Sequence, residues 1–203
     1  DACANSCIVN GPGTPTLALG SKHSCAVRRS DRVLMCWGRN DEGQLGINSN
    51  RTNQATPTAV EGIEQPLMLA AGDYYTCAVV TSGQLFCWGS NNDGQLGDDS
   101  DTQRRAPVRV EGIPAVARVA AGQAHTCAIT RDEGHLYCWG ANDGGQVGNG
   151  SLQTAYVPQR VQLDGASDIA LGGLSSCAIV NGQVHCWGRN DPYQHLGWDG
   201  AGR

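Results

Sequence analysis

A pair of cysteines recurs four times along this chain at a nearly constant separation. In each copy the first cysteine is followed by Ala and an aliphatic residue, and the second, nine to eleven positions later, is followed by Trp-Gly. The four pairs are Cys25 with Cys36, Cys77 with Cys87, Cys127 with Cys138 and Cys177 with Cys186. A unit of about fifty residues that repeats in this way predicts a stack of similar β-modules rather than one irregular enzyme domain.

Each cysteine pair flanks a predicted β-hairpin. In the last copy the turn is Asn181-Gly182, a dipeptide that accepts positive φ at both central positions of a type I′ turn. Counting outward from this turn pairs Cys177 with Cys186, and in the other copies three residues also separate each cysteine from a longer loop. Residues opposed in this way have Cα atoms about 4.5 Å apart, within reach of a disulfide. We therefore expect four cross-strand disulfides.

Two other roles for these eight cysteines are a zinc site and burial as small apolar side chains. A structural zinc site takes two closely spaced pairs of ligands, whereas each pair here has its own hairpin between the two sulfurs. We expect neither a metal nor a cofactor. Cys3 and Cys7 lie outside the hairpin scheme, and they pair either with each other or with a neighbouring chain.

Disulfides in this number predict an oxidising compartment, so we expect a secreted or cell-surface protein. The chain begins at Asp1 without a visible signal peptide, as expected of a mature or excised product. The sequence contains no run of about eighteen apolar residues, so no membrane span is predicted. Asn50 and Asn149 each begin an Asn-x-Ser/Thr pattern in a polar loop, which makes both candidates for glycosylation.

Composition and charge favour an all-β protein that does not bind nucleic acid. The 28 glycines and 8 prolines punctuate short strands, and no segment keeps a helical apolar period for three turns. The formal net charge is −5, and Lys22 is the single lysine. Such a chain lacks the positive field that attracts a phosphate backbone.

The repeated unit contains four predicted strands, which is the content of a propeller blade. It opens with an extended strand such as 107–112, continues through a second strand such as 119–122, and then runs through the cysteine hairpin. In the first copy, residues 7–11 and 17–20 take the first two places. One domain, residues 1–203, is thus expected to hold four blades at approximately 6–50, 51–101, 102–151 and 152–198. The four blades either close, form part of a longer arc, or are completed by other chains.

Three motifs in each unit resemble the regulator of chromosome condensation repeat family. They are Gly-x-x-His-Ser/Thr-Cys-Ala, Cys-Trp-Gly and Asn-Asp-x-Gly-Gln-Leu-Gly, seen for instance at 20–26, 43–46, 94–97 and 145–148. The resemblance covers about residues 6–198 and implies a β-propeller or a propeller arc. The cysteine pairs are similar to those of the secreted, disulfide-bearing branch found in bacterial surface proteins. Members of the family usually close seven blades, whereas this chain has four.

The chain departs from the family pattern at two places. His23 and His125 occupy the family's histidine position, but Tyr75 and Ser175 replace histidine in the other copies, so we expect no catalytic role shared by all blades. The fourth closing segment, 190–197, is one residue longer than the others and is expected to cap the array or to meet a partner. The candidate ligand contacts near it are Trp198, Tyr193 and His195.

The remaining repeated side chains are expected to be structural. The tryptophans after the second cysteine should pack between blades rather than stack on sugars, and the asparagines after Trp-Gly should satisfy turn backbone. The acidic stretch 98–101 is expected to be a solvated loop rather than a calcium site. The tryptophans are Trp37, Trp88, Trp139 and Trp187, and the asparagines are Asn40, Asn91, Asn142 and Asn190.

No nucleophile elbow, zincin helix or phosphate-binding loop is present in the sequence, so an enzyme is not expected. The favoured function is a non-catalytic extracellular module, a disulfide-stapled propeller that presents loops for protein binding or assembles head to tail with copies of itself. A carbohydrate-binding lectin with repeated sites is the first alternative. An exchange factor for a small GTPase, which only the family resemblance suggests, is the second.

Overall fold

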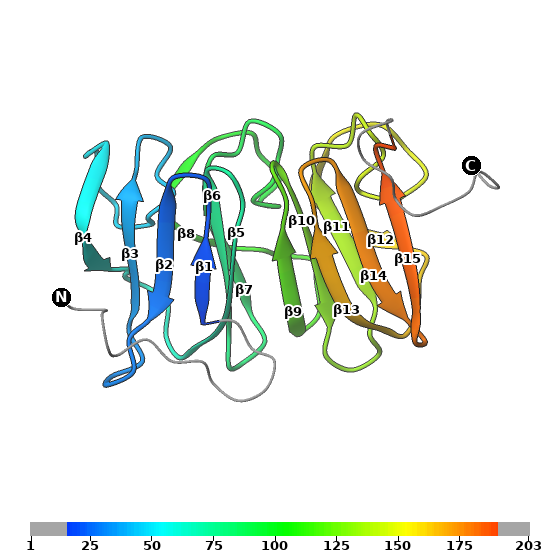
Figure 1. The fold of residues 1–203 in the computed structure, drawn as a ribbon, viewed down its shortest axis with the longest axis horizontal. Coiled ribbons are helices and arrows are strands. Elements are labelled where there is room, and N and C mark those ends of the chain that lie inside the picture. The colour runs from blue at the N-terminus through cyan, green and yellow to red at the C-terminus, as the bar shows by residue number, and fades with distance from the viewer. Residues whose placement is uncertain (1–15, 191–203) are drawn as a thin grey trace.

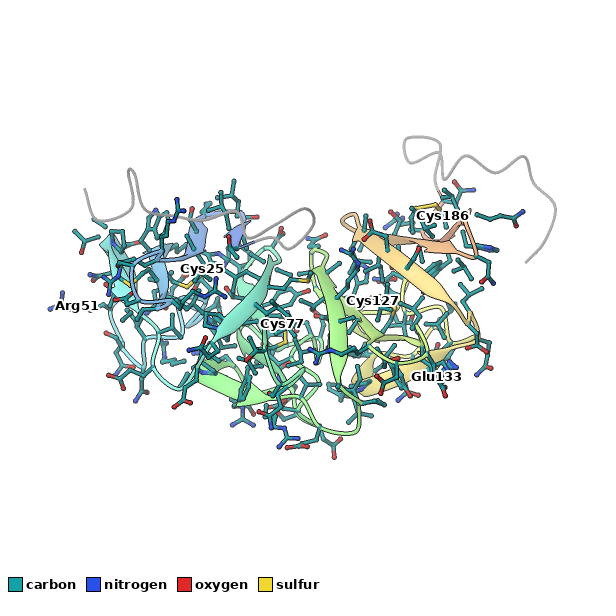
Figure 2. All side chains as sticks on the ribbon, turned by 90° about the horizontal axis from the view of Figure 1, so that it is seen from below. Cys25, Arg51, Cys77, Cys127, Glu133 and Cys186 are labelled. Carbon is teal, nitrogen blue, oxygen red and sulfur yellow. A yellow bond between two sulfur atoms is a disulfide. The ribbon has the colours of Figure 1, made fainter. Side chains whose placement is uncertain are left out.

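The computed structural model describes residues 16–190, which form fifteen β-strands. Within this range there is no helix, and hence none that could cross a membrane. The strands lie in four antiparallel sheets that follow one another along an open arc (Figure 1, Figure 2). The all-β propeller arc expected from the repeat is therefore confirmed.

We number the sheets as blades I to IV in chain order. Blade I contains β1 (Leu17–Leu19), β2 (His23–Val27), β3 (Leu34–Arg39) and β4 (Asn53–Ala59). Blade II contains β5 (Pro66–Ala71), β6 (Tyr75–Val80), β7 (Leu85–Gly89) and β8 (Arg104–Arg109). Blade III contains β9 (Val116–Ala121), β10 (His125–Thr130), β11 (Leu136–Gly140) and β12 (Ala155–Val161). Blade IV contains β13 (Ala166–Leu171), β14 (Ser175–Val180) and β15 (Gln183–Gly188).

The structure divides the repeat one strand later than the sequence analysis does. The extended strands β4, β8 and β12, expected to open blades II, III and IV, are hydrogen-bonded to the third strand of the preceding hairpin. The third strand has an unpaired edge, and the next extended segment along the chain satisfies it before the chain crosses to the following blade. Among the described residues, blade IV therefore has three strands rather than four.

The four hairpins have the register predicted by counting outward from their turns. Asn181 and Gly182 have φ values of 51° and 80°, as a type I′ turn requires, and Cys177 lies opposite Cys186. All four predicted disulfides are present, with Cα atoms 4.1 to 4.2 Å apart. Figure 2 shows one labelled cysteine of each disulfide in four successive sheets.

The outermost strand of each complete blade carries a proline near its middle. Pro57, Pro107 and Pro158 lie in β4, β8 and β12, respectively. Because proline has no N–H group, it weakens the exposed edge as a template for a further strand. The proline in each of these outermost strands therefore disfavours the pairing of a fifth strand with the outer edge of the blade.

The apolar core lies between the blades. One cluster fills the space between blades I and II, and a second runs through blades II, III and IV. The first strands β1, β5, β9 and β13 contact one another in chain order along the arc. Stability thus depends on how each blade packs on the next one.

Candidate functional site

Consecutive blades are joined through one main-chain carbonyl. At the joint of blades II and III, the carbonyl oxygen of Gln95 accepts hydrogen bonds from the Trp139 indole at 3.0 Å and from the Thr126 hydroxyl at 2.8 Å. Trp139 and Thr126 are fully buried. The same contact is made by Gln44 with Trp88 and Thr76, and by Gln146 with Trp187 and Ser176. Trp88, Trp139 and Trp187 therefore pack between blades, as predicted.

The last glycine of each closing motif is the surface on which the next tryptophan packs. Gly97 has a φ of +70°, and a Cβ atom placed there would lie 2.7 Å from Nε1 of Trp139. Gly46 and Gly148 have the same relationship to Trp88 and Trp187. Both the positive φ and the close approach require glycine.

The asparagine and glutamine of the motif hold the closing segment in shape. Asn142 accepts a hydrogen bond from the Val147 amide at 2.9 Å and donates to the carbonyl oxygens of Ser151 and Gln153, both at 2.9 Å. Asn40 and Asn91 make equivalent bonds. The structural role expected for these three asparagines is confirmed. Asn190 is the last described residue, and the segment that it opens lies outside the described range.

The family's histidine position is a second contact between blades. The Ser176 hydroxyl donates its hydrogen to Gln146, so the bond of 3.0 Å between Ser176 and His125 has Nε2–H of His125 as donor. His23 and Thr76 repeat this arrangement at 2.8 Å. Within residues 16–190 the Nδ1 atoms of both histidines are buried acceptors without a hydrogen-bond partner, and burial lowers the pKa of each ring to about 4. Both rings are therefore neutral structural groups.

Four equivalent turns line a hollow on the arc axis, with a volume of about 440 Å³. In each turn the glycine amide donates to the carbonyl three residues later, for example from Gly122 to His125 at 2.8 Å. The backbone thus repeats, but the side chain after the glycine does not. The glycines and the residues that follow them are Gly20-Ser21, Gly72-Asp73, Gly122-Gln123 and Gly172-Gly173. We name these four turns the axial turns.

The axial turns of blades I and II meet through polar contacts. Ser21 donates to the Asp73 carboxylate at 2.9 Å, and the guanidinium of Arg39 lies 5.4 Å from the centre of the Tyr74 ring. Arg39 also forms an ion pair with Asp41, which lowers the pKa of that carboxyl. Arg39, Asp73 and the half-buried ring of Tyr74 are therefore held in place where blades I and II meet, and of these three residues Asp73 lines the hollow.

Trp88 and Trp139 cannot serve as sugar platforms, because neither ring is exposed. Trp37 and Trp187 are partly buried, and the indole of Trp187 is already bonded to Gln146. The candidate ligand contacts Trp198, Tyr193 and His195, together with Cys3 and Cys7, lie outside the described residues.

The first aspartate of the acidic loop is satisfied by its own protein neighbours. Asp98 pairs with Arg104 at 2.7 Å and accepts from Ser100 at 2.8 Å and Asn91 at 2.9 Å. Within residues 16–190 no three His, Cys, Asp or Glu side chains are placed to hold a metal ion. Of the two glycosylation candidates, Asn50 is exposed, whereas Asn149 is partly buried and accepts from the Ser151 amide.

Sequence reasoning missed the main-chain carbonyl that joins the blades. The sequence signal for this contact is the serine or threonine that precedes the first cysteine of every hairpin. These residues are Ser24, Thr76, Thr126 and Ser176. A side chain of this kind at an otherwise apolar position needs a hydrogen-bond acceptor when it is buried. The axial turns were also missed, because their meeting at one hollow depends on how the blades are arranged in space.

The family model described as "Regulator of chromosome condensation (RCC1) repeat" matches residues 34–79, 82–129 and 133–179. Human E3 ubiquitin-protein ligase HERC2 is 31% identical over 189 residues, which are 89% of this chain and 4% of HERC2. The crystal structure of human WBSCR16 matches with a TM-score of 0.75 at 23% identity, over 89% of this chain and 48% of that one. Yeast RCC1 (Prp20), solved with Kap60, matches with a TM-score of 0.73 at 23% identity, over 89% of this chain and 45% of that one.

The chain thus spans a small part of HERC2 and about half of each of the two solved chains named above. The likeness to the solved structures concerns the fold, which agrees with the four blades described above. The three matches of the repeat model extend over more than half of the sequence, and each runs from the second strand of one cysteine hairpin through a closing motif to the first strand of the next hairpin. The chain belongs to the regulator of chromosome condensation (RCC1) repeat family.

Proposed function

We propose that this chain is a non-catalytic protein-binding module of the cell exterior, and that the axial turns hold its partner. The observation that carries this proposal is the contrast within those turns. Their backbone hydrogen bonds repeat from blade to blade, whereas the residue after the glycine changes from Ser21 to Asp73, Gln123 and Gly173. A rigid frame that presents variable side chains is typical of a recognition surface.

The chemistry of the axial turns suits a protein partner. Arg39 and Tyr74 are residue types that contribute strongly to protein interfaces, and each is already held in place by its neighbours. Asp73, which lines the hollow, and Lys22, which follows Ser21 in the chain, add charges of both signs. Yeast RCC1 (Prp20), which has the same fold, was solved bound to the protein Kap60, and this supports protein binding as a use of the fold.

The proposed location rests on the four disulfides. Three of them are fully buried between blades, where they require oxidation before or during folding. Counting free thiols in the native protein tests this part of the proposal. Reduced hairpin cysteines would exclude the extracellular location and would favour the exchange-factor alternative.

A photo-crosslinking experiment tests the axial turns. A benzophenone amino acid replaces Tyr74 in one variant and Val157, an exposed residue of β12, in a matched control. Both variants are applied to the surface of the producing cells, with unlabelled chain as competitor. We expect one protein to be captured from position 74 only and to be displaced by the wild-type chain, but not by the double variant Asp73→Lys, Tyr74→Ala.

Equal capture from positions 74 and 157 would contradict the proposed surface. Capture of glycan without protein, together with quenching of tryptophan fluorescence by free sugar, would instead support the lectin alternative. Nucleotide release from a small GTPase on addition of the chain would support the exchange-factor alternative.

A further inference from the structure

Two Asn-Gly dipeptides lie within residues 16–190, Asn181-Gly182 and Asn149-Gly150. In such a dipeptide the main-chain nitrogen of the glycine can attack Cγ of the asparagine side chain, because glycine has no side chain that obstructs the approach. The asparagine then loses ammonia. Since the two dipeptides have the same sequence, a difference in their reactivity must come from the fold.

The glycine nitrogens of the two dipeptides are equally accessible. Gly182 and Gly150 have φ values of 80° and 77° and are exposed, and at both a Cβ atom would have no atom beyond its chain neighbours within 4 Å. Within residues 16–190 neither glycine amide donates a hydrogen bond. The attacking group is therefore the same in both, and the asparagine side chain decides the rate.

The side chain of Asn149 is held by two hydrogen bonds. Its amide oxygen accepts from the Ser151 main-chain amide at 3.0 Å and from the Asn142 side chain at 3.3 Å. Asn142 is 1% exposed and is itself fixed by the closing motif. Ring closure requires the Asn149 side chain to rotate, which breaks both hydrogen bonds and costs free energy.

The side chain of Asn181 has no comparable restraint. It lies in the exposed two-residue turn between β14 and β15, at the lower right of Figure 1. Among the described residues, its one side-chain hydrogen bond is a donation to the Asp164 carbonyl oxygen at 3.4 Å, a length at which such a bond is weak. No described group donates to the Asn181 amide oxygen. Rotation of this side chain therefore costs little.

We propose that Asn181 deamidates spontaneously in the folded protein, whereas Asn149 is protected. The Gly182 nitrogen forms a bond to Cγ of Asn181 and gives its proton to solvent, and the side-chain nitrogen takes up a proton from water and leaves as ammonia. The product is a succinimide ring. Water then adds to one of the two ring carbonyl carbons and breaks its C–N bond, which gives aspartate or isoaspartate. Water is the single co-reactant, and the proposal is independent of the axial turns.

The modification changes the tip of blade IV and leaves its frame intact. Either product places at position 181 a carboxylate that is ionised at neutral pH. Isoaspartate also adds one atom to the main chain, so the two-residue type I′ turn cannot close in the same way. Cys177 lies four residues before Asn181, and Cys186 lies four residues after Gly182, so their disulfide keeps β14 and β15 joined. The product is therefore a folded chain with an altered turn.

The test follows both asparagines in one sample of the 203-residue chain. The protein is made with its disulfides in a host that adds no glycans to asparagine, and it is then kept at neutral pH. After reduction, trypsin places the two sites in separate peptides, 132–160 and 161–189. Mass spectrometry and chromatography against synthetic standards measure asparagine, aspartate and isoaspartate in each peptide. We expect Asn181 to react at least about tenfold faster than Asn149, which corresponds to about 1.4 kcal/mol of protection.

The same chain, reduced and unfolded in guanidinium chloride, is the matched control. Without the fold the two dipeptides have the same local chemistry, so their rates should become similar. Gly182→Ala tests the attacking group, because the added methyl group should slow the reaction at Asn181 and leave Asn149 unchanged. Alanine at a φ of 80° strains the turn, so free thiols are counted to confirm that the disulfides of this variant have formed.

The comparison of folded and unfolded wild-type chain does not depend on the variant. Equal rates at Asn181 and Asn149 in the folded chain would overturn the proposal, as would a folded chain in which Asn181 does not react. A rate difference that persists after unfolding would show that the fold is not its cause. An unchanged rate at Asn181 in Gly182→Ala would exclude the Gly182 nitrogen as the attacking group.

Discussion

The indole Nε1 of Trp139 lies 3.0 Å from the carbonyl oxygen of Gln95, forty-four residues earlier in the chain. This bond crosses from blade III to blade II and is fully buried. Trp139→Phe should therefore lower the free energy of unfolding by about 2 to 4 kcal/mol, through a lost hydrogen bond and a small cavity. Urea unfolding measures the change. Trp37→Phe is the control and should cost about 1 kcal/mol or less, because this ring is partly exposed and its indole has no hydrogen-bond partner among residues 16–190. Equal losses in both variants would contradict the importance of the joint.

Gly97→Ala should destabilise the protein more than Gly112→Ala. Both glycines have positive φ, at 70° and 73°, so both variants suffer the backbone strain of about 1 kcal/mol or more. Only at Gly97 does the new methyl group also overlap the Trp139 ring, which adds about 1 to 3 kcal/mol. Nothing lies within 4 Å of the corresponding atom at Gly112. Equal denaturation midpoints for the two variants would contradict the prediction, because they would mean that the Trp139 ring can move aside for the methyl group without loss of stability.

Stability should fall as the pH is lowered from about 6.5 towards 4. Burial lowers the pKa of His23 and His125 to about 4, below the ordinary value of 6.5, so the unfolded chain binds more protons than the folded one in this window. Each histidine contributes a loss of roughly 3 kcal/mol across the window. Chemical denaturation at several pH values measures it. His125→Gln should reduce the slope by about half, whereas His185→Gln, at an exposed position, should not change it. An unchanged slope in His125→Gln would mean that other groups cause the acid sensitivity.

Asn142→Ala should cost stability before it affects binding. The side chain is 1% exposed and satisfies the Val147 amide and two carbonyl groups of the following loop. Leaving these groups unpaired should lower the free energy of unfolding by about 2 to 3 kcal/mol. Asn53→Ala, at an exposed position of β4, should cost less than about 0.5 kcal/mol. If partner binding is lost in Asn142→Ala at full stability, this asparagine has a ligand role instead.

Glycosylation, in a eukaryotic secretory host, should be more complete at Asn50 than at Asn149. Asn50 is exposed, whereas the Asn149 amide oxygen accepts from the Ser151 main chain at 3.0 Å and from Asn142 at 3.3 Å. The Asn149 side chain must break these hydrogen bonds before it can bind in the active site of the glycosylating enzyme. Peptide mass spectrometry before and after glycan removal gives the occupancies, and a higher value at Asn149 would contradict the prediction.

The hairpins could be predicted from the sequence because their determinants are local. Asn181-Gly182 specifies its turn, and the count from that turn fixes the opposition of Cys177 and Cys186. The blade division could not be predicted in the same way. The position of β4 beside β3 depends on which unpaired strand edge is nearest in space. The period of the repeat does not help, because it is the same wherever the boundary between two blades is placed.

The candidate site was predicted less well than the fold. Three of the four tryptophans and three of the four asparagines were assigned correctly because burial and turn backbone follow from residue type; they are Trp88, Trp139, Trp187, Asn40, Asn91 and Asn142. The axial turns were not, since Ser21 and Asp73 come into contact only when two blades stack. The carbonyl of Gln95 is also invisible to side-chain patterns, because every residue has the same main-chain acceptor.

The use of a main-chain carbonyl at every joint has a consequence for how such a gene changes over time. A contact that depends on two matched side chains would need paired substitutions whenever a unit is duplicated or lost. Here any copy of the closing motif meets any copy of the hydroxyl and the indole. Unequal recombination between repeats therefore yields a chain whose new neighbours already fit, and the number of blades is free to drift while the interface between them stays constant.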